Sequence, residues 1–147
     1  MGDTGQNWGS LTHAQYDPGG GSQDVDGVAV NDTASITTDE IPIDSGNYSA
    51  GEISVIAVED DTGACDGDLI VKVLRSDNDP DSEGWQDPDD DAPWSITLTP
   101  ERNKTKRLTF SIDLAQVSSC KIYVYNDAGQ QLAITINYRF AQIPAAS

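Results

Sequence analysis

Alternation of apolar and polar side chains is the sequence feature that most limits how this chain can fold. Over residues 131–140 large apolar side chains alternate with small or polar ones, and the same period of two recurs over 94–99 and 107–114. This period places one face of an extended segment in a core and the other in water. No segment carries ten residues of helical periodicity. The pattern therefore predicts an all-β protein.

Seven short segments of this kind follow one another from residue 34 to residue 140, with turn signals between them. This spacing is typical of an antiparallel β-sandwich or jelly roll. Segments 52–59, 69–75 and 120–125 are apolar on both faces in places, so we expect them to be central or covered. The last two strands, joined through 126–129, are expected to form a hairpin.

The alternation also predicts which side chains form the core. Trp94 continues the inward positions of its strand, whereas Trp85 is expected to be exposed. The aromatic residues Tyr123, Tyr125 and Tyr138 fit half-buried cross-strand pairs, and the alternative is a row that stacks on sugars. The remaining predicted core residues are Ile96, Leu98, Leu108, Phe110, Ile112, Ile134 and Ile136.

Residues 1–30 differ from the rest of the chain because they are polar and glycine-rich and lack apolar periodicity. We expect an extended N-terminal arm there, followed by a β-sandwich domain over 31–147. A loose terminus is the ordinary expectation for such a segment. The alternative is an arm that orders on a neighbouring subunit, with Trp8 and Tyr16 as anchors.

Charge excludes several function classes. The chain carries 25 Asp and Glu against 8 Lys and Arg, a net charge of −17. Binding to nucleic acid or to an anionic membrane is therefore not expected. Of the acidic residues 20 are Asp, which prefers turns, so the acidity belongs to loops. Such loops suit either divalent-cation ligation or solubility in concentrated salt.

The most acidic stretch runs from residue 77 to 94. Its first three aspartates have the one-three-five spacing of a calcium loop, but Ser82 replaces the required glycine and Pro88 replaces the bidentate glutamate. We favour a solvated acidic loop. The alternative is an irregular calcium site, whose ligands would be Asp77, Asp79, Asp81, Asp87 and Asp89. No other cofactor is expected.

Nothing in the sequence selects an enzymatic site, and we predict that the protein is not an enzyme. The single histidine, His13, lies in the arm, and Cys65 and Cys120 have no adjacent base. The chain has no apolar run long enough to span a membrane. The two cysteines either form one bridge between loop ends or stay as half-buried thiols, and because no secretory signal is visible at the start of the sequence we favour free thiols. Two-carboxylate glycosidase chemistry stays open, but no pair stands out among so many acids.

Basic charge is concentrated in one place, which we call the basic turn. Half of all Lys and Arg lies within six residues, where it either docks on an acidic partner or keeps a strand edge soluble. The basic turn comprises Arg102, Lys104, Lys106 and Arg107.

Three stretches carry a resemblance to a known class: 69–77 followed by Gly84 and Trp85, then 106–112, and 133–140. Together they resemble β-sandwich virion proteins of tailed viruses, of the capsid decoration or cement type. The resemblance covers about two thirds of the chain.

The resemblance implies a structural protein without catalytic residues. Such a protein binds the major capsid protein as a homotrimer and lies on the capsid surface after assembly in the host cytoplasm. The docking residues would then be those of the arm and the basic turn: Trp8, Tyr16, Arg102, Lys104, Lys106 and Arg107. The acidic loops would indicate a saline host. The alternative function is a calcium-dependent adhesin or carbohydrate-binding module, as a tail or fibre component.

Overall fold

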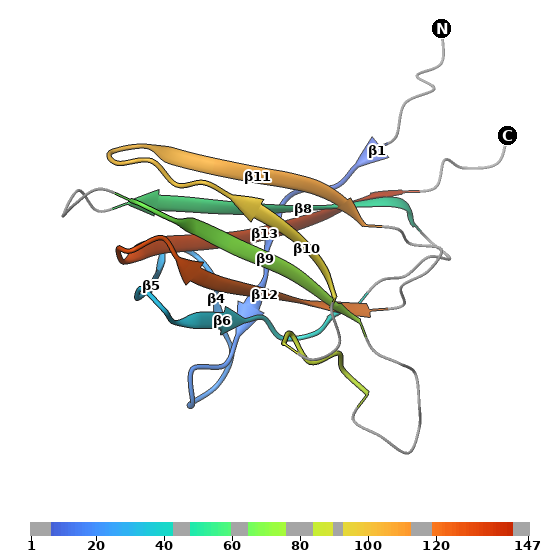
Figure 1. Ribbon diagram of the computed structural model, residues 1–147. Coiled ribbons are helices and arrows are strands. Elements are labelled where there is room, and N and C mark those ends of the chain that lie inside the picture. The colour runs from blue at the N-terminus through green and yellow to red at the C-terminus, as the bar shows by residue number, and fades with distance from the viewer. Residues whose placement is uncertain are drawn as a thin grey trace, which may run out of the picture.

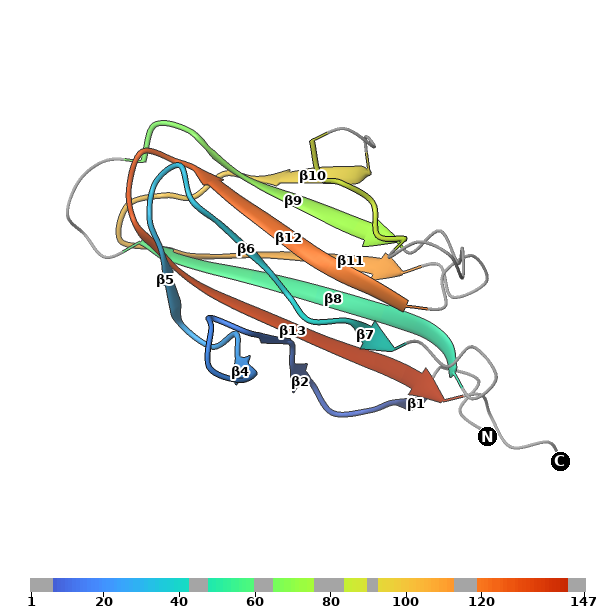
Figure 2. The same ribbon diagram turned by 90° about the horizontal axis from the view of Figure 1, so that it is seen from below.

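The computed structural model describes residues 7–42, 48–59, 65–75, 84–89, 93–112 and 119–142. Every regular element in these ranges is a β-strand, and two antiparallel sheets pack face to face (Figures 1 and 2). The predicted all-β sandwich is confirmed. No helix in the described part of the chain is long and apolar enough to span a membrane.

The first sheet has six strands, with β8 at its centre. β8 pairs with β11 on one side and with β13 on the other, and three short N-terminal strands pair with the far side of β13. The strands are β11 (Thr105–Ile112), β8 (Tyr48–Glu59), β13 (Leu132–Gln142), β1 (Asn7–Trp8), β2 (Thr12–His13) and β5 (Val28–Val30).

The second sheet has five strands, and a separate two-stranded hairpin lies beside the sandwich. In spatial order the second sheet runs β10 (Trp94–Leu98), β9 (Asp68–Arg75), β12 (Ser119–Asp127) and β6 (Ser35–Thr37), with β7 (Ile41–Pro42) also on β12. The hairpin consists of β3 (Gln15–Tyr16) and β4 (Gln23–Asp24).

The chain passes from one sheet to the other after β5, β7, β8, β10, β11 and β12, as in a jelly roll. The expected hairpin between the last two strands is therefore wrong, because β12 and β13 lie in different sheets. The buried side chain of Asn126 explains the change of sheet. It holds the turn by accepting a hydrogen bond from the N–H of Ala128 at 2.9 Å and by donating to the carbonyl of Gln130 at 2.7 Å.

The core lies between the sheets where the alternation predicted it. Leu98, Phe110, Ile112, Ile134 and Ile136 are buried, and the other two predicted residues, Ile96 and Leu108, are partly buried against them.

Trp94 is a correction to the predicted core, since its side chain is 48% exposed. It points inward but sits on β10, the edge of its sheet, where no further strand of the described residues covers it. Its ring rests on Phe110, with ring centroids 5.1 Å apart. Alternation thus identified the face on which Trp94 lies and not its distance from the sheet edge.

The expected N-terminal arm is also corrected. Within the described residues 7–30, three strands hydrogen-bond to β13, and Ala14 and Val25 are buried in the core (Figure 2). The N–H of Ala14 donates to the carbonyl of Ile136 at 2.8 Å, and the N–H of Ile136 donates to that of Val25 at 3.0 Å. The segment therefore completes the sandwich through backbone pairing, which needs no apolar repeat.

Candidate functional site

The two long free strand edges of the described residues lie on the same side of the molecule. β10 ends the five-stranded sheet and β11 ends the six-stranded one, and the turn over residues 99–104 connects them (Figure 1). The opposite edges carry only strands of two or three residues. Short edge strands discourage pairing with other chains, whereas long ones invite it. We call the side formed by β10 and β11 the open side.

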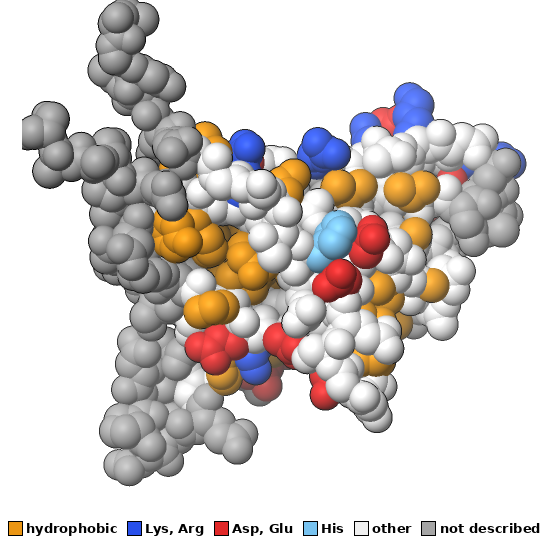
Figure 3. All heavy atoms as spheres, turned by 180° about the vertical axis from the view of Figure 1, so that it is seen from behind, with side chains coloured by type: hydrophobic (Ala, Val, Ile, Leu, Met, Phe, Trp, Pro, Cys, Tyr) orange, Lys and Arg blue, Asp and Glu red, His pale blue; other side chains and the backbone are white. Residues whose placement is uncertain are grey.

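The basic turn lies at this open side. Arg102, Lys104 and Arg107 are exposed and Lys106 is partly buried. Figure 3 shows Lys and Arg side chains along the top of the molecule, where β11 runs, with an acidic side chain among them, and most of the visible acidic side chains lower down. The structure therefore brings the four predicted residues together at a free sheet edge.

One acidic residue partly neutralises the basic turn. The carboxylate oxygens of Glu101 lie 2.8 Å from the ammonium nitrogen of Lys104 and 2.8 Å from that of Lys106. Hydrogen bonds from both ammonium groups, with Coulombic attraction added, lower the pKa of Glu101 to about 2. The same contacts raise the pKa of Lys104. The basic turn is thus preformed around one carboxylate.

A second carboxylate, buried at the end of β8, fixes the backbone of the basic turn. Oε2 of Glu59 accepts a hydrogen bond from the N–H of Asn103 at 2.8 Å. Asn103 has a φ of 62°, a left-handed conformation that asparagine tolerates well. Oε1 of Glu59 is the buried side-chain polar atom without a hydrogen-bond partner within the described ranges.

Trp8 and Tyr16, the predicted anchors, do not join the basic turn. Trp8 pairs with Ala141 near the end of β13, whereas Glu59, which holds the turn, pairs with Leu132 at its start. Nine residues of strand separate these points, a distance of about 30 Å. Arg139 covers the Trp8 ring at 4.8 Å from its centroid, and Tyr16 packs partly against the core. Both aromatics therefore have intramolecular partners.

Only two of the five predicted calcium ligands lie in the described residues. Asp77, Asp79 and Asp81 lie outside the described residues, while Asp87 and Asp89 are exposed on the 84–89 segment. Oδ1 of Asp87 accepts a hydrogen bond from the N–H of Asp89 at 2.8 Å. Across the ranges that the structure describes, no group of three or more His, Cys, Asp or Glu could hold a metal ion. The calcium site stays a prediction.

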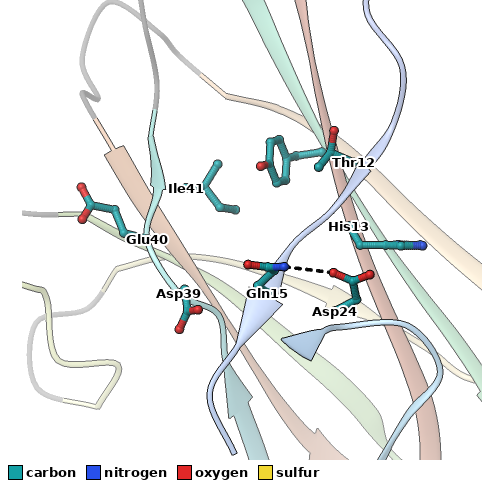
Figure 4. Close-up of a pocket in the computed structure, with 8 residues that line it drawn as sticks. Thr12, His13, Gln15, Asp24, Asp39, Glu40 and Ile41 are labelled. Atoms are coloured by element: carbon teal, nitrogen blue, oxygen red, sulfur yellow. Dashed lines mark hydrogen bonds between the residues drawn. The ribbon is translucent and has the colours of Figure 1, made fainter. Parts of the chain in front are cut away.

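A polar cleft of about 360 Å³ separates β2 and β3 from β7 (Figure 4). Gln15 donates to Asp24 at 3.2 Å, and His13 lies 2.5 Å from the amide oxygen of Asn137. In Figure 4 Asp39 and Glu40 extend away from Asp24, and His13 points to the opposite side. In this view the side chains do not converge on one point.

In the structure Cys65 and Cys120 are not joined in a disulfide. Cys120 is buried on β12, and this burial raises the pKa of its thiol to about 12. Cys65 is half-buried. The thiol of Cys120 is therefore protonated and unreactive at neutral pH.

The outer face of the five-stranded sheet is a candidate site for which the sequence indicated the tyrosines but not their neighbours. Tyr123 and Tyr125 lie there beside Ile70, Lys72 and Asp89 and line a groove of about 420 Å³. The signal was present in the alternation along β12: from Cys120 onward its buried positions are the even-numbered ones, so both tyrosines face outward.

Trp85 was expected to be exposed and is instead half-buried. The ammonium group of Lys121 lies 4.6 Å from the centre of its ring, a cation–π contact that covers part of the indole.

No protein-family model matches this chain, and no curated protein sequence is significantly similar to it. Among solved structures it is similar to one titled "CBM4 structure and function", with 14% identity and a TM-score of 0.40. That match covers 78% of this chain and 70% of the other. No functional conclusion follows from it.

Proposed function

We propose that this protein is a non-enzymatic structural protein of a virion, a decoration or cement protein that binds the major capsid protein and stabilises the shell. The observation that carries the proposal is the basic turn at the open side of a molecule with a net charge of −17. The sequence resemblance to capsid decoration proteins supports the same conclusion. The protein would act on the capsid surface as a homotrimer, and its acidic loops suit a saline host.

The charge distribution gives the basic turn a physical role in docking. A local positive patch on a negative molecule orients it toward an acidic partner and raises the rate of association. The exposed ring of Trp94 lies on the same open side and adds apolar area that a partner would bury. Binding only to the assembled shell stabilises that shell by mass action.

The open side replaces the N-terminal segment as the main docking surface in this proposal. Trp8 is covered by Arg139, and residues 7–30 pair with β13 of their own chain. The backbone groups of β10 and β11 on their outer sides have no strand partner among the described elements. A neighbouring copy or a strand of the capsid protein would satisfy them.

Association with undecorated capsids of the parent virus tests the proposal. We expect the protein to co-sediment with the capsids, and Arg107→Glu to slow association about tenfold at low salt, because long-range attraction is screened at high salt. Arg75→Glu is the matched control, since it makes the same charge change at an exposed strand residue away from the basic turn.

Failure of the parent protein to bind capsids would overturn the proposal. Equal association rates for the parent protein, Arg107→Glu and Arg75→Glu would place docking elsewhere on the molecule.

A calcium-dependent adhesin or carbohydrate-binding module is the second candidate function, favoured by the two tyrosines on the outer face of the five-stranded sheet. The two candidates differ in their response to a chelator. A calcium-dependent module loses thermal stability in EDTA, whereas a cement protein that needs no cofactor keeps it.

A further inference from the structure

The outer face of the five-stranded sheet presents aromatic rings surrounded by hydroxyl groups. Across the sheet, Tyr123 pairs with Thr37 and Lys72, and Tyr125 pairs with Ser35 and Ile70. On the next strand, Ser95 pairs with Lys72 and Thr97 with Ile70. The four hydroxyl residues are exposed and the two tyrosines are half-buried. We call this surface, with the groove that Tyr123 and Tyr125 line, the tyrosine face.

The 84–89 segment forms one wall of the tyrosine face. The ammonium group of Lys72 donates to the carbonyl oxygen of Pro88 at 2.6 Å and lies 5.9 Å from the centre of the Tyr123 ring. These two contacts fix Lys72 at the junction of wall and floor. Its ammonium group has three donors and uses one on Pro88, which leaves two for a ligand. The exposed Asp89 on the wall adds a carboxylate acceptor.

The mixture of groups identifies the chemistry of the ligand. A sugar ring has an apolar C–H face that stacks on an aromatic ring and a rim of hydroxyl groups that donate and accept hydrogen bonds. The tyrosine face offers the complement of both. A protein partner would instead favour a contiguous apolar centre, which the interleaved hydroxyls and Lys72 interrupt.

Size and charge narrow the ligand further. The groove of about 420 Å³ lies within the ordinary range for small-ligand sites. Tyr123 and Tyr125 are two residues apart on one strand, so their attachment points are about 6.7 Å apart. That distance is comparable to the length of one pyranose unit in an extended chain. The net charge of −17 disfavours an anionic polysaccharide.

We propose that the tyrosine face binds a neutral oligosaccharide, with two successive sugar units stacked on Tyr123 and Tyr125 and with hydroxyl groups bonded to Lys72 and Asp89. This inference gives the second candidate function a site and a ligand class, and it does not require calcium. It is independent of docking through the open side, so a decoration protein could carry it as well.

Affinity electrophoresis of the full chain in native gels tests the proposal. The probes are soluble neutral polysaccharides with different linkages, namely β-glucan, xylan, mannan and galactan, and alginate serves as an anionic probe. We expect at least one neutral polysaccharide to retard the protein in EDTA, and alginate not to. Tyr123→Ala and Tyr125→Ala should each weaken that retardation about tenfold through lost stacking, and Tyr123→Phe should retain it.

Trp94→Ala is the matched control, because it removes a more exposed aromatic side chain from the open side. It should leave retardation unchanged. A thermal unfolding curve for each variant separates lost binding from lost folding, and if one of the two alanine variants unfolds, the other still tests the role of the tyrosine face. Capsid co-sedimentation of Tyr123→Ala should match the parent protein, so the two proposals fail separately.

Three results would overturn the proposal. The first is the absence of retardation by every neutral polysaccharide, and the second is binding of alginate alone. The third is retardation that folded Tyr123→Ala and Tyr125→Ala variants retain in full.

Discussion

Replacing Asn126 by alanine should destabilise the protein far more than its single polar side chain suggests. Asn126 is fully buried, and its amide makes three hydrogen bonds. Its nitrogen donates to the carbonyls of Val30 at 2.9 Å and Gln130 at 2.7 Å, and its oxygen accepts from the N–H of Ala128 at 2.9 Å. One side chain thus ties the N-terminal segment to the turn that carries the chain between the sheets.

The size of the effect follows from these bonds. Each net hydrogen bond contributes about 1 kcal/mol, and a buried group left without a partner costs about 1–3 kcal/mol more. Because water entering the vacated space restores part of this loss, we expect Asn126→Ala to lower the free energy of unfolding by about 3 kcal/mol. Urea unfolding followed by fluorescence measures it, with an unchanged slope.

A nearby exposed amide provides the control. Gln131 donates to Asn31 at 2.6 Å on the surface, so Gln131→Ala should cost less than about 0.5 kcal/mol. A loss below about 1 kcal/mol for Asn126→Ala would refute the reasoning, since it would mean that the three bonds do not hold the turn.

The isosteric variant Asn126→Asp gives the same argument a pH dependence. Its second carboxylate oxygen would face two carbonyl oxygens in a buried site, which raises the pKa of the new side chain above that of unfolded aspartate. A raised pKa means that stability is greatest below the unfolded value and falls as the pH rises. Asn126→Asp should therefore be less damaging near pH 4 than at pH 7. The opposite trend would contradict the assigned orientation of the amide.

Four further predictions concern other parts of the molecule. Phe110→Ala should lower the free energy of unfolding by about 3 kcal/mol, because Phe110 is only 9% exposed. Trp94→Ala removes the ring that packs on Phe110, and it should lower the free energy of unfolding by only about 1 kcal/mol because Trp94 is more exposed. Gly67→Ala should lower the melting temperature, since a Cβ there would lie 2.0 Å from the carbonyl oxygen of Asp127, and Gly20→Ala, in open space, should not. Cys120 should resist a thiol reagent until the protein unfolds, and fast labelling of Cys120 in the folded state would contradict its burial. The parent protein should be more stable than Glu101→Gln above about pH 4.5, and this difference in stability should be lost by about pH 2, because the pKa of Glu101 is lowered. Urea unfolding at a series of pH values measures the difference.

Period-two alternation predicted the fold well because it reports on burial directly. Burial along β13 alternates as predicted over residues 132–136, where Ile134 and Ile136 are fully buried. Alternation assigns a side chain to a face of a sheet, however, and gives no information about the position of the strand within that sheet. Trp94 lies on the inner face and is nevertheless exposed, because its strand is an edge.

The N-terminal strands could not be found from the pattern. β1, β2 and β5 are two or three residues long, and a strand of that length shows no period. These strands pair with β13 through backbone hydrogen bonds, and the order of side chains in the sequence says little about such pairing. The change of sheet after β12 has the same origin, since it depends on the buried amide of Asn126, a residue that ordinarily marks a solvated turn.

The candidate sites differ in how far the sequence could define them. The four residues of the basic turn are adjacent in the chain, so composition alone located them. The tyrosine face draws Ile70 and Lys72 from one strand and Tyr123 and Tyr125 from another, which only the register of β9 and β12 brings together. Trp8 and the basic turn illustrate the opposite case, because both were predicted to dock and the structure places them at opposite ends of one sheet.

The positions of the two proposed surfaces allow them to be tested independently. The order β10, β9, β12 places the tyrosines two strand spacings, about 10 Å, from the open edge at β10, and the basic turn adjoins β11 in the other sheet. Substitutions that share no partner at such distances usually have additive effects. A combined Arg107→Glu and Tyr123→Ala variant should therefore lose capsid association to the extent of the first change alone, and polysaccharide retardation to the extent of the second. A loss in either assay beyond that of the single variant would mean that one ligand contacts both surfaces. Because Ser95 and Thr97 of the tyrosine face lie on β10, which also forms the edge of the open side, such a ligand would have to cross that strand.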